Sequence, residues 1–162
     1  MLRLAVLSDL EKEHNEVLQK LGLLGLTIQS FETIEAGHSK QIEDGRKLLN
    51  FIDEKIIPHF QMEETILFPT LERLTSIDKG LILSYRAEHK KILAEVEEFK
   101  KIVSSQSGDF GIIKDQIVKD IMAHATRENE ELIPLTRKLI TEEQAEQLDK
   151  ILTDKKAFKN TH

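Results

Sequence analysis

The sequence contains no cysteine and no tryptophan, and only seven glycines and three prolines interrupt its 162 residues. The absence of cysteine excludes disulfides, cysteine nucleophiles and thiolate-bound clusters. Any metal must therefore be held by imidazole and oxygen ligands, which suit iron, manganese or zinc. Aromatic residues make up only 5% of the chain, whereas leucine, isoleucine, glutamate and lysine are abundant. This balance favours helix over sheet.

Long apolar runs are also missing. None approaches the roughly 20 residues that a membrane-spanning helix needs, and the apolar start at 1–7 is too short for the core of a signal peptide. The net charge of −6 gives no electrostatic reason to expect nucleic acid or an anionic membrane as partner. We therefore expect one domain, residues 1–162, located in the cytoplasm.

Apolar residues recur at helical spacing in four long stretches. The stretches cover about 8–36, 39–74, 78–104 and 110–140. Ser8 is expected to cap the first helix and Ala36-Gly37 to end it, while Pro58 should kink the second or shift its register. Long helices joined by short connections predict an all-α fold, an up-down antiparallel four-helix bundle spanning about 8–140.

A short fifth helix is expected to follow the bundle. Thr141 and Gln144 have the spacing of a capping box at the start of a helix over about 142–155. The remaining residues, 155–162, are polar and are expected to fray.

The chain contains a weak internal duplication. Each half has a Glu-His pair on its first helix and a His-x-x-x-Glu motif on its second, with a proline ten residues after the second histidine. These residues are Glu13-His14, His59, Glu63 and Pro69 in the first half, and Glu88-His89, His124, Glu128 and Pro134 in the second. Residues four apart share one face of a helix, so an imidazole and a carboxylate so placed can reach one metal.

The four histidines should lie at one level of the bundle. In an antiparallel hairpin, residues equidistant from the turn face each other. The midpoints between 14 and 59, 59 and 89, and 89 and 124 are 36.5, 74 and 106.5, and each falls at a predicted connection. At about 1.5 Å of rise per residue, the remaining offsets are a few ångströms.

Six residues are therefore the candidate metal ligands. They are His14, His59, Glu63, His89, His124 and Glu128. Each lies in line with apolar residues, so each should face the core, where two unpaired carboxylates would cost several kcal/mol or more. A dinuclear cation is the simplest compensation. Of the remaining acids, Glu64, Glu130 and Glu131 are expected in solvent or behind the ligands. Glu13 and Glu88 recur in both halves but do not share a face with their own neighbouring histidine.

Tyr85 lies one turn before His89 on the same stripe, and its counterpart in the first half is Leu10. Two interpretations stay open. Tyr85 is a core tyrosine with a bonded hydroxyl, or it is a hydrogen-bond donor behind the ligands and an occasional ligand beside an open coordination position.

Together these motifs resemble the hemerythrin-like (HHE cation-binding) family over about residues 7–140. The resemblance implies two irons, one held by His14 and His59 and the other by His89 and His124. Glu63 and Glu128 would bridge both irons together with an oxo or hydroxo group. Oxygen-carrying hemerythrins have a fifth histidine, roughly where Tyr85 stands. The four-histidine set is more similar to the hemerythrin-like domains of iron–sulfur-centre repair proteins, which also carry a short cysteine-containing domain.

A centre of this kind leaves about one open position on each six-coordinate iron. The leading hypothesis is a di-iron protein that binds or senses O₂, NO or peroxide. The alternatives are an enzyme that reduces peroxide or NO, an iron storage or delivery protein of the repair type, and a metal-free helical interaction module. The residues do not decide between binding and turnover, and they predict no oligomeric state.

Overall fold

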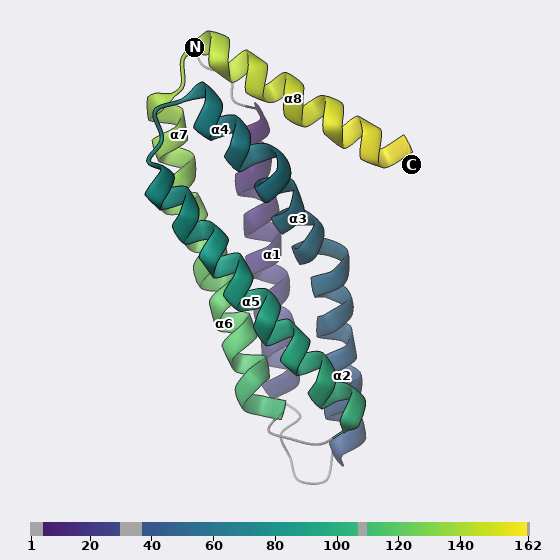
Figure 1. The fold of residues 1–162 in the computed structure, drawn as a ribbon. Coiled ribbons are helices and arrows are strands. Elements are labelled where there is room, and N and C mark those ends of the chain that lie inside the picture. The colour runs from purple at the N-terminus through teal and green to yellow at the C-terminus, as the bar shows by residue number, and fades with distance from the viewer. Residues whose placement is uncertain (1–4, 30–36, 107–109, 162) are drawn as a thin grey trace.

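Four long helical legs run side by side in alternating directions, and a fifth helix leaves one end of the bundle at an angle (Figure 1). The computed structural model describes residues 5–29, 37–106 and 110–161. Consecutive legs run in opposite directions, so the topology is up-down-up-down. The expected all-α four-helix bundle with a C-terminal fifth helix is confirmed.

The legs differ in how many helical segments they contain. The first is α1 (Ala5–Gln29), and the third is α5 (Lys79–Ser105). The second consists of α2 (Gly37–Phe51), α3 (Ile57–Met62) and α4 (Phe68–Leu74), joined by π-helical turns at Ile52–Ile56 and Glu63–Leu67. The fourth consists of α6 (Phe110–Arg127) and α7 (Ile133–Leu139), joined by a π-helical turn at Glu128–Leu132.

Several expected helix boundaries are wrong. Ser8 does not cap the first helix, because α1 already begins at Ala5 and the Ser8 hydroxyl instead accepts a hydrogen bond from Arg137 at 3.2 Å. Gly37 does not end the first helix but is the first residue of α2, while Ala36 lies outside the described residues. Of the predicted 104–109 loop, Ser105 still belongs to α5, and Gln106 ends the helix in the left-handed conformation with φ 55°.

The fifth helix, α8 (Glu142–Thr161), begins as predicted but is longer. The Thr141 N–H donates to the Gln144 side chain at 3.0 Å, and the Gln144 N–H donates to the Thr141 hydroxyl at 3.2 Å, which completes the capping box. Because α8 continues to Thr161, the expected end near residue 155 is wrong.

Each of the three prolines follows a π-helical turn. A proline in a helix lacks an N–H and its ring clashes with the carbonyl four residues back. In all three turns that carbonyl belongs to the widened segment, where bonding to the residue five positions on opens the backbone. The N–H of Phe68, for example, bonds the Glu63 carbonyl ahead of Pro69, and the same arrangement precedes Pro58 and Pro134. The predicted register shift at Pro58 is confirmed.

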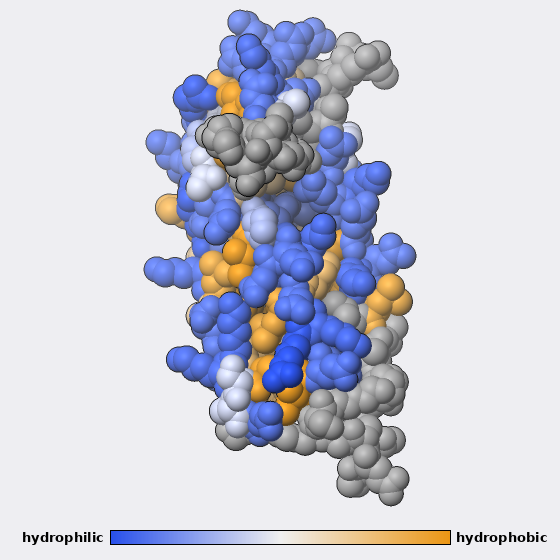
Figure 2. All heavy atoms as spheres, turned by 90° about the vertical axis from the view of Figure 1, so that its right-hand side faces the viewer, coloured by the Kyte–Doolittle hydropathy of each residue, from blue (hydrophilic) through white to orange (hydrophobic). Residues whose placement is uncertain are grey.

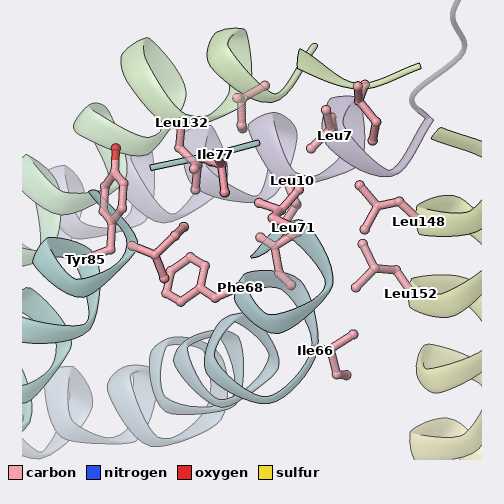
Figure 3. Close-up of a cluster of buried hydrophobic side chains, with 14 of the residues drawn as sticks. Leu7, Leu10, Ile66, Phe68, Leu71, Ile77, Tyr85, Leu132, Leu148 and Leu152 are labelled. Carbon is pink, nitrogen blue, oxygen red and sulfur yellow. The ribbon is translucent and has the colours of Figure 1, made fainter. Parts of the chain in front are cut away.

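The apolar core is divided into two clusters along the bundle. One cluster, at the α8 end, includes the labelled side chains of Figure 3: Leu7, Leu10, Ile66, Phe68, Leu71, Ile77, Tyr85, Leu132, Leu148 and Leu152. The other fills the opposite half around Phe99. On α1, His14 lies between Leu10 of the first cluster and Leu21 of the second, and on α5 His89 likewise separates the clusters. Buried histidines and glutamates thus occupy the layer between two apolar regions.

Polar side chains cover most of one long face of the bundle, with apolar atoms in a strip along its length (Figure 2). This distribution is what amphipathic legs packed around a core produce. No helix in the described ranges is both long enough and apolar enough to cross a membrane.

A carboxyl pair lies between α5 and α6, away from the histidine layer. The pKa of Glu95 is raised to about 7, first by burial and then by a hydrogen bond with, and repulsion from, the carboxylate of Asp120. The positive charge of Lys91 opposes this shift only in part. Lys91 lies 3.4 Å from Asp120 and 3.9 Å from Glu95, and the Gln116 amide donates to both Asp120 oxygens at 3.0 Å. These contacts favour ionised Asp120 and protonated Glu95.

Glu95→Gln is expected to stabilise the fold at pH 8 by about 1 kcal/mol and to have little effect near pH 4. The folded-state pKa of Glu95 is raised above its ordinary 4.5. Its stabilising protonated state is therefore fully present below pH 4.5 and is lost as pH rises through about 7. Chemical unfolding at both pH values measures the difference, with the exposed Glu146→Gln on α8 as control. An equal effect at both pH values would contradict the assignment.

Candidate metal centre

All six predicted ligands meet in the layer between the two apolar clusters. Their ligand atoms form two groups, and within each group the atoms lie within 4.8 Å of one another. One group contains His14 and His59, the other contains His89 and His124, and both contain Glu63 and Glu128. Five of the six side chains are buried, and the His59 side chain is 13% exposed. The arrangement has two positions that share two carboxylates.

The distances within each group match those of atoms around one metal. The Nε2 atoms of His14 and His59 are 3.0 Å apart, as are those of His89 and His124. Two ligand atoms at right angles around a metal with bonds of about 2.1 Å are about 3 Å apart. Two neutral imidazole nitrogens this close together can share at most one proton. A metal ion between them would accept the lone pairs of both nitrogens.

Both carboxylates are left with unpaired buried atoms. Glu63 has one oxygen, and Glu128 has two, that are buried and without a hydrogen-bond partner. Within the described part of the chain, only the four histidines form ion pairs with these carboxylates. Because a buried uncompensated carboxylate is costly, this donor set fits a doubly charged cation at each position.

The carboxylates also attract protons to the histidines. Burial alone would lower the pKa of His59 and His124, but the nearby carboxylates of Glu63 and Glu128 outweigh this effect. The pKa of His59 is raised well above its ordinary value, and that of His124 to about 11. Burial of Glu63 is likewise outweighed, first by His59, so its pKa falls well below the ordinary value. Metal and protons therefore compete for these imidazoles, and binding a metal would release protons.

The second ring nitrogen, Nδ1, of each histidine faces an acceptor outside the layer. The four contacts are His14 to Asn129 at 2.7 Å, His124 to Glu88 at 3.2 Å, His59 to Glu13 at 3.7 Å and His89 to Glu64 at 3.8 Å. An acceptor at Nδ1 fixes the proton there and directs the lone pair of Nε2 toward the metal. His14 and His124 are thus oriented for binding through Nε2, while the carboxylates behind His59 and His89 lie beyond hydrogen-bond distance.

Sequence reasoning missed the roles of Glu13 and Glu88. Each precedes a histidine on its own helix but faces the histidine of the other helix in its hairpin, His59 and His124 respectively. The signal was the recurring Glu-His pair, because a residue one position away from a core-facing histidine points to the side, toward a neighbouring helix. Glu64 lies behind His89 as one expectation allowed, and Glu130 is exposed.

Tyr85 is fully buried, and its hydroxyl is already occupied. The hydroxyl donates to Glu131 at 2.8 Å, and the tyrosine ring lies nearly perpendicular to the His124 imidazole with centroids 5.8 Å apart. In Figure 3 the oxygen points away from Phe68 and the apolar cluster. Burial, followed by the hydrogen bond to Glu131, raises the pKa of Tyr85, so the phenol stays protonated. These contacts favour a core tyrosine that supports His124.

Tyr85→Phe should leave metal content unchanged and lower Tm by a few degrees. The change removes one hydrogen bond, about 1 kcal/mol, and keeps the ring packing. Tyr85→Ala, which also empties the space of the ring, is expected to cost about 3–5 kcal/mol. Elemental analysis and thermal unfolding distinguish the two roles: loss of metal from the Phe variant would show that the hydroxyl takes part in binding.

The family model of the hemerythrin HHE cation binding domain matches residues 5–136. The chain belongs to this family. The matched range includes every candidate ligand of the hemerythrin HHE domain described above, and the family resemblance seen in the sequence is confirmed.

Among curated proteins, this hemerythrin HHE domain is similar to the iron-sulfur cluster repair protein YtfE of Yersinia pseudotuberculosis serotype IB (strain PB1/+). The two are 27% identical over 142 residues, which is 80% of this chain and 62% of the relative. The chain thus spans less than two thirds of the relative's length. No solved structure matches it.

Proposed function

We propose that this hemerythrin HHE domain holds two iron ions and binds or senses a small molecule, O₂, NO or peroxide. The observation that supports it most strongly is the sharing of Glu63 and Glu128 by two pairs of histidines, with five of the six side chains buried. His14 and His59 would hold one ion, and His89 and His124 the other. Iron would supply a redox-active centre with a position left for a small ligand.

The surrounding side chains control access of water to the layer. Phe60 stacks on His89 with ring centroids 4.0 Å apart, and Phe68 stacks on the same imidazole at 5.8 Å. His59 is the partly exposed ligand, behind which lies the 38% exposed Glu13. Aromatic rings thus exclude water from the His89 side, while a small molecule can approach near His59. This arrangement suits binding of a small ligand on the His59 side of the layer.

Metal content and a visible spectrum test the proposal. The chain is purified, stripped of metal, loaded anaerobically with Fe(II), and analysed before and after exposure to air. About two irons per chain with bands typical of a bridged ferric pair would support it. The loaded protein is then titrated separately with O₂, NO and peroxide. A reversible spectral change indicates binding or sensing, and sustained consumption of NO or peroxide indicates an enzyme. Preferential retention of zinc or manganese, or of no metal, would contradict the proposal.

A second candidate, iron delivery, is favoured by the name of the relative, an iron-sulfur cluster repair protein. In that case the irons would be cargo held by the same six residues. Mixing the loaded chain with an apo iron–sulfur protein and inorganic sulfide, and following cluster formation, tests it. Transfer faster than passive release to a chelator supports delivery, and equal rates contradict it.

A further inference from the structure

Arg127 connects a metal-facing histidine to the polar side chains around Tyr85. Its guanidinium donates to Glu88 at 2.6 Å, to Glu131 at 3.0 Å and to the Ser84 hydroxyl at 2.8 Å. It also lies 4.3 Å from the centroid of the Tyr85 ring. These contacts use the fixed fork of the guanidinium, which holds several acceptors in one geometry.

Glu88 is held from two sides. One carboxylate oxygen accepts from Arg127, and the other faces His124 Nδ1 at 3.2 Å. The remaining histidines differ: His59 and His89 have carboxylates beyond hydrogen-bond distance, at 3.7 and 3.8 Å, and His14 has the neutral amide of Asn129. Of these four contacts, only the one at His124 combines a carboxylate with hydrogen-bond distance.

The polar cluster belongs to the second half of the duplication alone. Aligning His14 with His89 and His59 with His124 pairs Tyr85 with Leu10, Arg127 with Met62 and Glu131 with Ile66. In the first half these positions are apolar, and Leu10 and Ile66 are buried in the cluster at the α8 end, with Met62 packed against it. The two hairpins thus hold similar ligands with different support behind them.

We propose that Arg127 is a positioning residue that, through Glu88, makes the two metal positions unequal. A carboxylate accepting the Nδ1–H makes an imidazole a stronger donor at Nε2. His124 is then the strongest donor of the four histidines, and the position of His89 and His124 binds its metal first and releases it last. This inference rests on the proposed function, because it concerns the same six ligands.

Release of Fe(II) to a chelator tests the inference. The wild-type chain is expected to lose its two irons in two phases. Glu88→Gln should accelerate the slow phase about 10- to 100-fold, the usual effect of losing a hydrogen-bond partner of a ligand. The matched control, Glu13→Gln, changes the equivalent residue of the first half, and it should affect only the fast phase and by less, because Glu13 lies beyond hydrogen-bond distance of His59.

Two variants of Arg127 separate positioning from folding. Arg127→Met installs the residue of the first half and should accelerate the slow phase, while Arg127→Lys, which keeps a charge near Glu88, should restore part of the wild-type rate. In the Mössbauer spectrum, Glu88→Gln and Arg127→Met should shift the signal of one iron and leave the other. Circular dichroism verifies the fold, and if one variant does not fold, the other still decides.

The possible failures are distinguishable. A wild-type chain that binds no iron would remove the proposed function and this inference with it. A chain that binds two irons but releases them in one phase would overturn the inference alone. So would equal effects of Glu88→Gln and Glu13→Gln.

Discussion

Glu128→Ala should abolish binding of two metals and weaken the affinity for a remaining one by about 100-fold or more. Glu128 lies in both groups of ligand atoms, and its oxygens face His14 on one side and His124 on the other. Removing it takes one anionic donor from each position at once. It also removes negative charge that would offset the repulsion between two cations.

Equilibrium dialysis with Fe(II), followed by elemental analysis, measures the loss. Glu130→Ala provides the matched control, because Glu130 is exposed and two residues away on the same π-helical turn. We expect it to keep the wild-type metal content. Glu63→Ala should behave like Glu128→Ala, because Glu63 also lies in both groups. Retention of two irons by either ligand variant would be incompatible with shared carboxylates.

Removing metal from the wild-type chain should lower its Tm by about 10 °C. A ligand that binds only the folded state at about 1,000 times its Kd stabilises that state by about 4 kcal/mol. In a chain of this size each kcal/mol corresponds to about 2–4 °C. The expected cause is the layer of buried carboxylates and imidazoles between the two clusters, because removing the metal takes away the cation that offsets their desolvation.

Thermal unfolding with and without a strong chelator measures this effect. Readdition of Fe(II) should restore the original Tm, and the curve should shift with free metal concentration. The Glu128→Ala variant supplies the control, since a chelator should hardly change its Tm. A wild-type Tm that ignores both chelator and metal would show that the layer is stable without a cation.

The level at which the ligands meet could be predicted from sequence because it depends on distance along helices. Residue counts between breaks place His14, His59, His89 and His124 at one height, and the four-residue spacing places a glutamate beside two of them. The structure brings these residues together as predicted. Their identity as metal ligands stays a prediction until metal is measured.

The contacts behind the ligands could not be predicted in the same way. Whether Glu88 meets its own neighbour or His124 depends on how far each helix is rotated about its axis, and rotation follows from packing of all four legs. The prolines indicated disturbed helix but did not reveal π-helical turns. The start of α1 was missed because Leu7 and Leu10 extend the apolar face toward the N-terminus, which outweighs the capping preference of Ser8.

The π-helical turns divide each proline-containing leg into joined helices, three in the second leg and two in the fourth. Glu63 and Glu128 are the first residues of such turns. A π turn holds about one residue more than an α turn, and one residue corresponds to about 100° of rotation. The ten-residue interval from histidine to proline in both halves contains this extra residue. Deleting this residue would rotate the helix that follows the turn, α4 or α7, so that its apolar face no longer pointed toward α8. The histidine that precedes the turn, His59 or His124, would keep its direction.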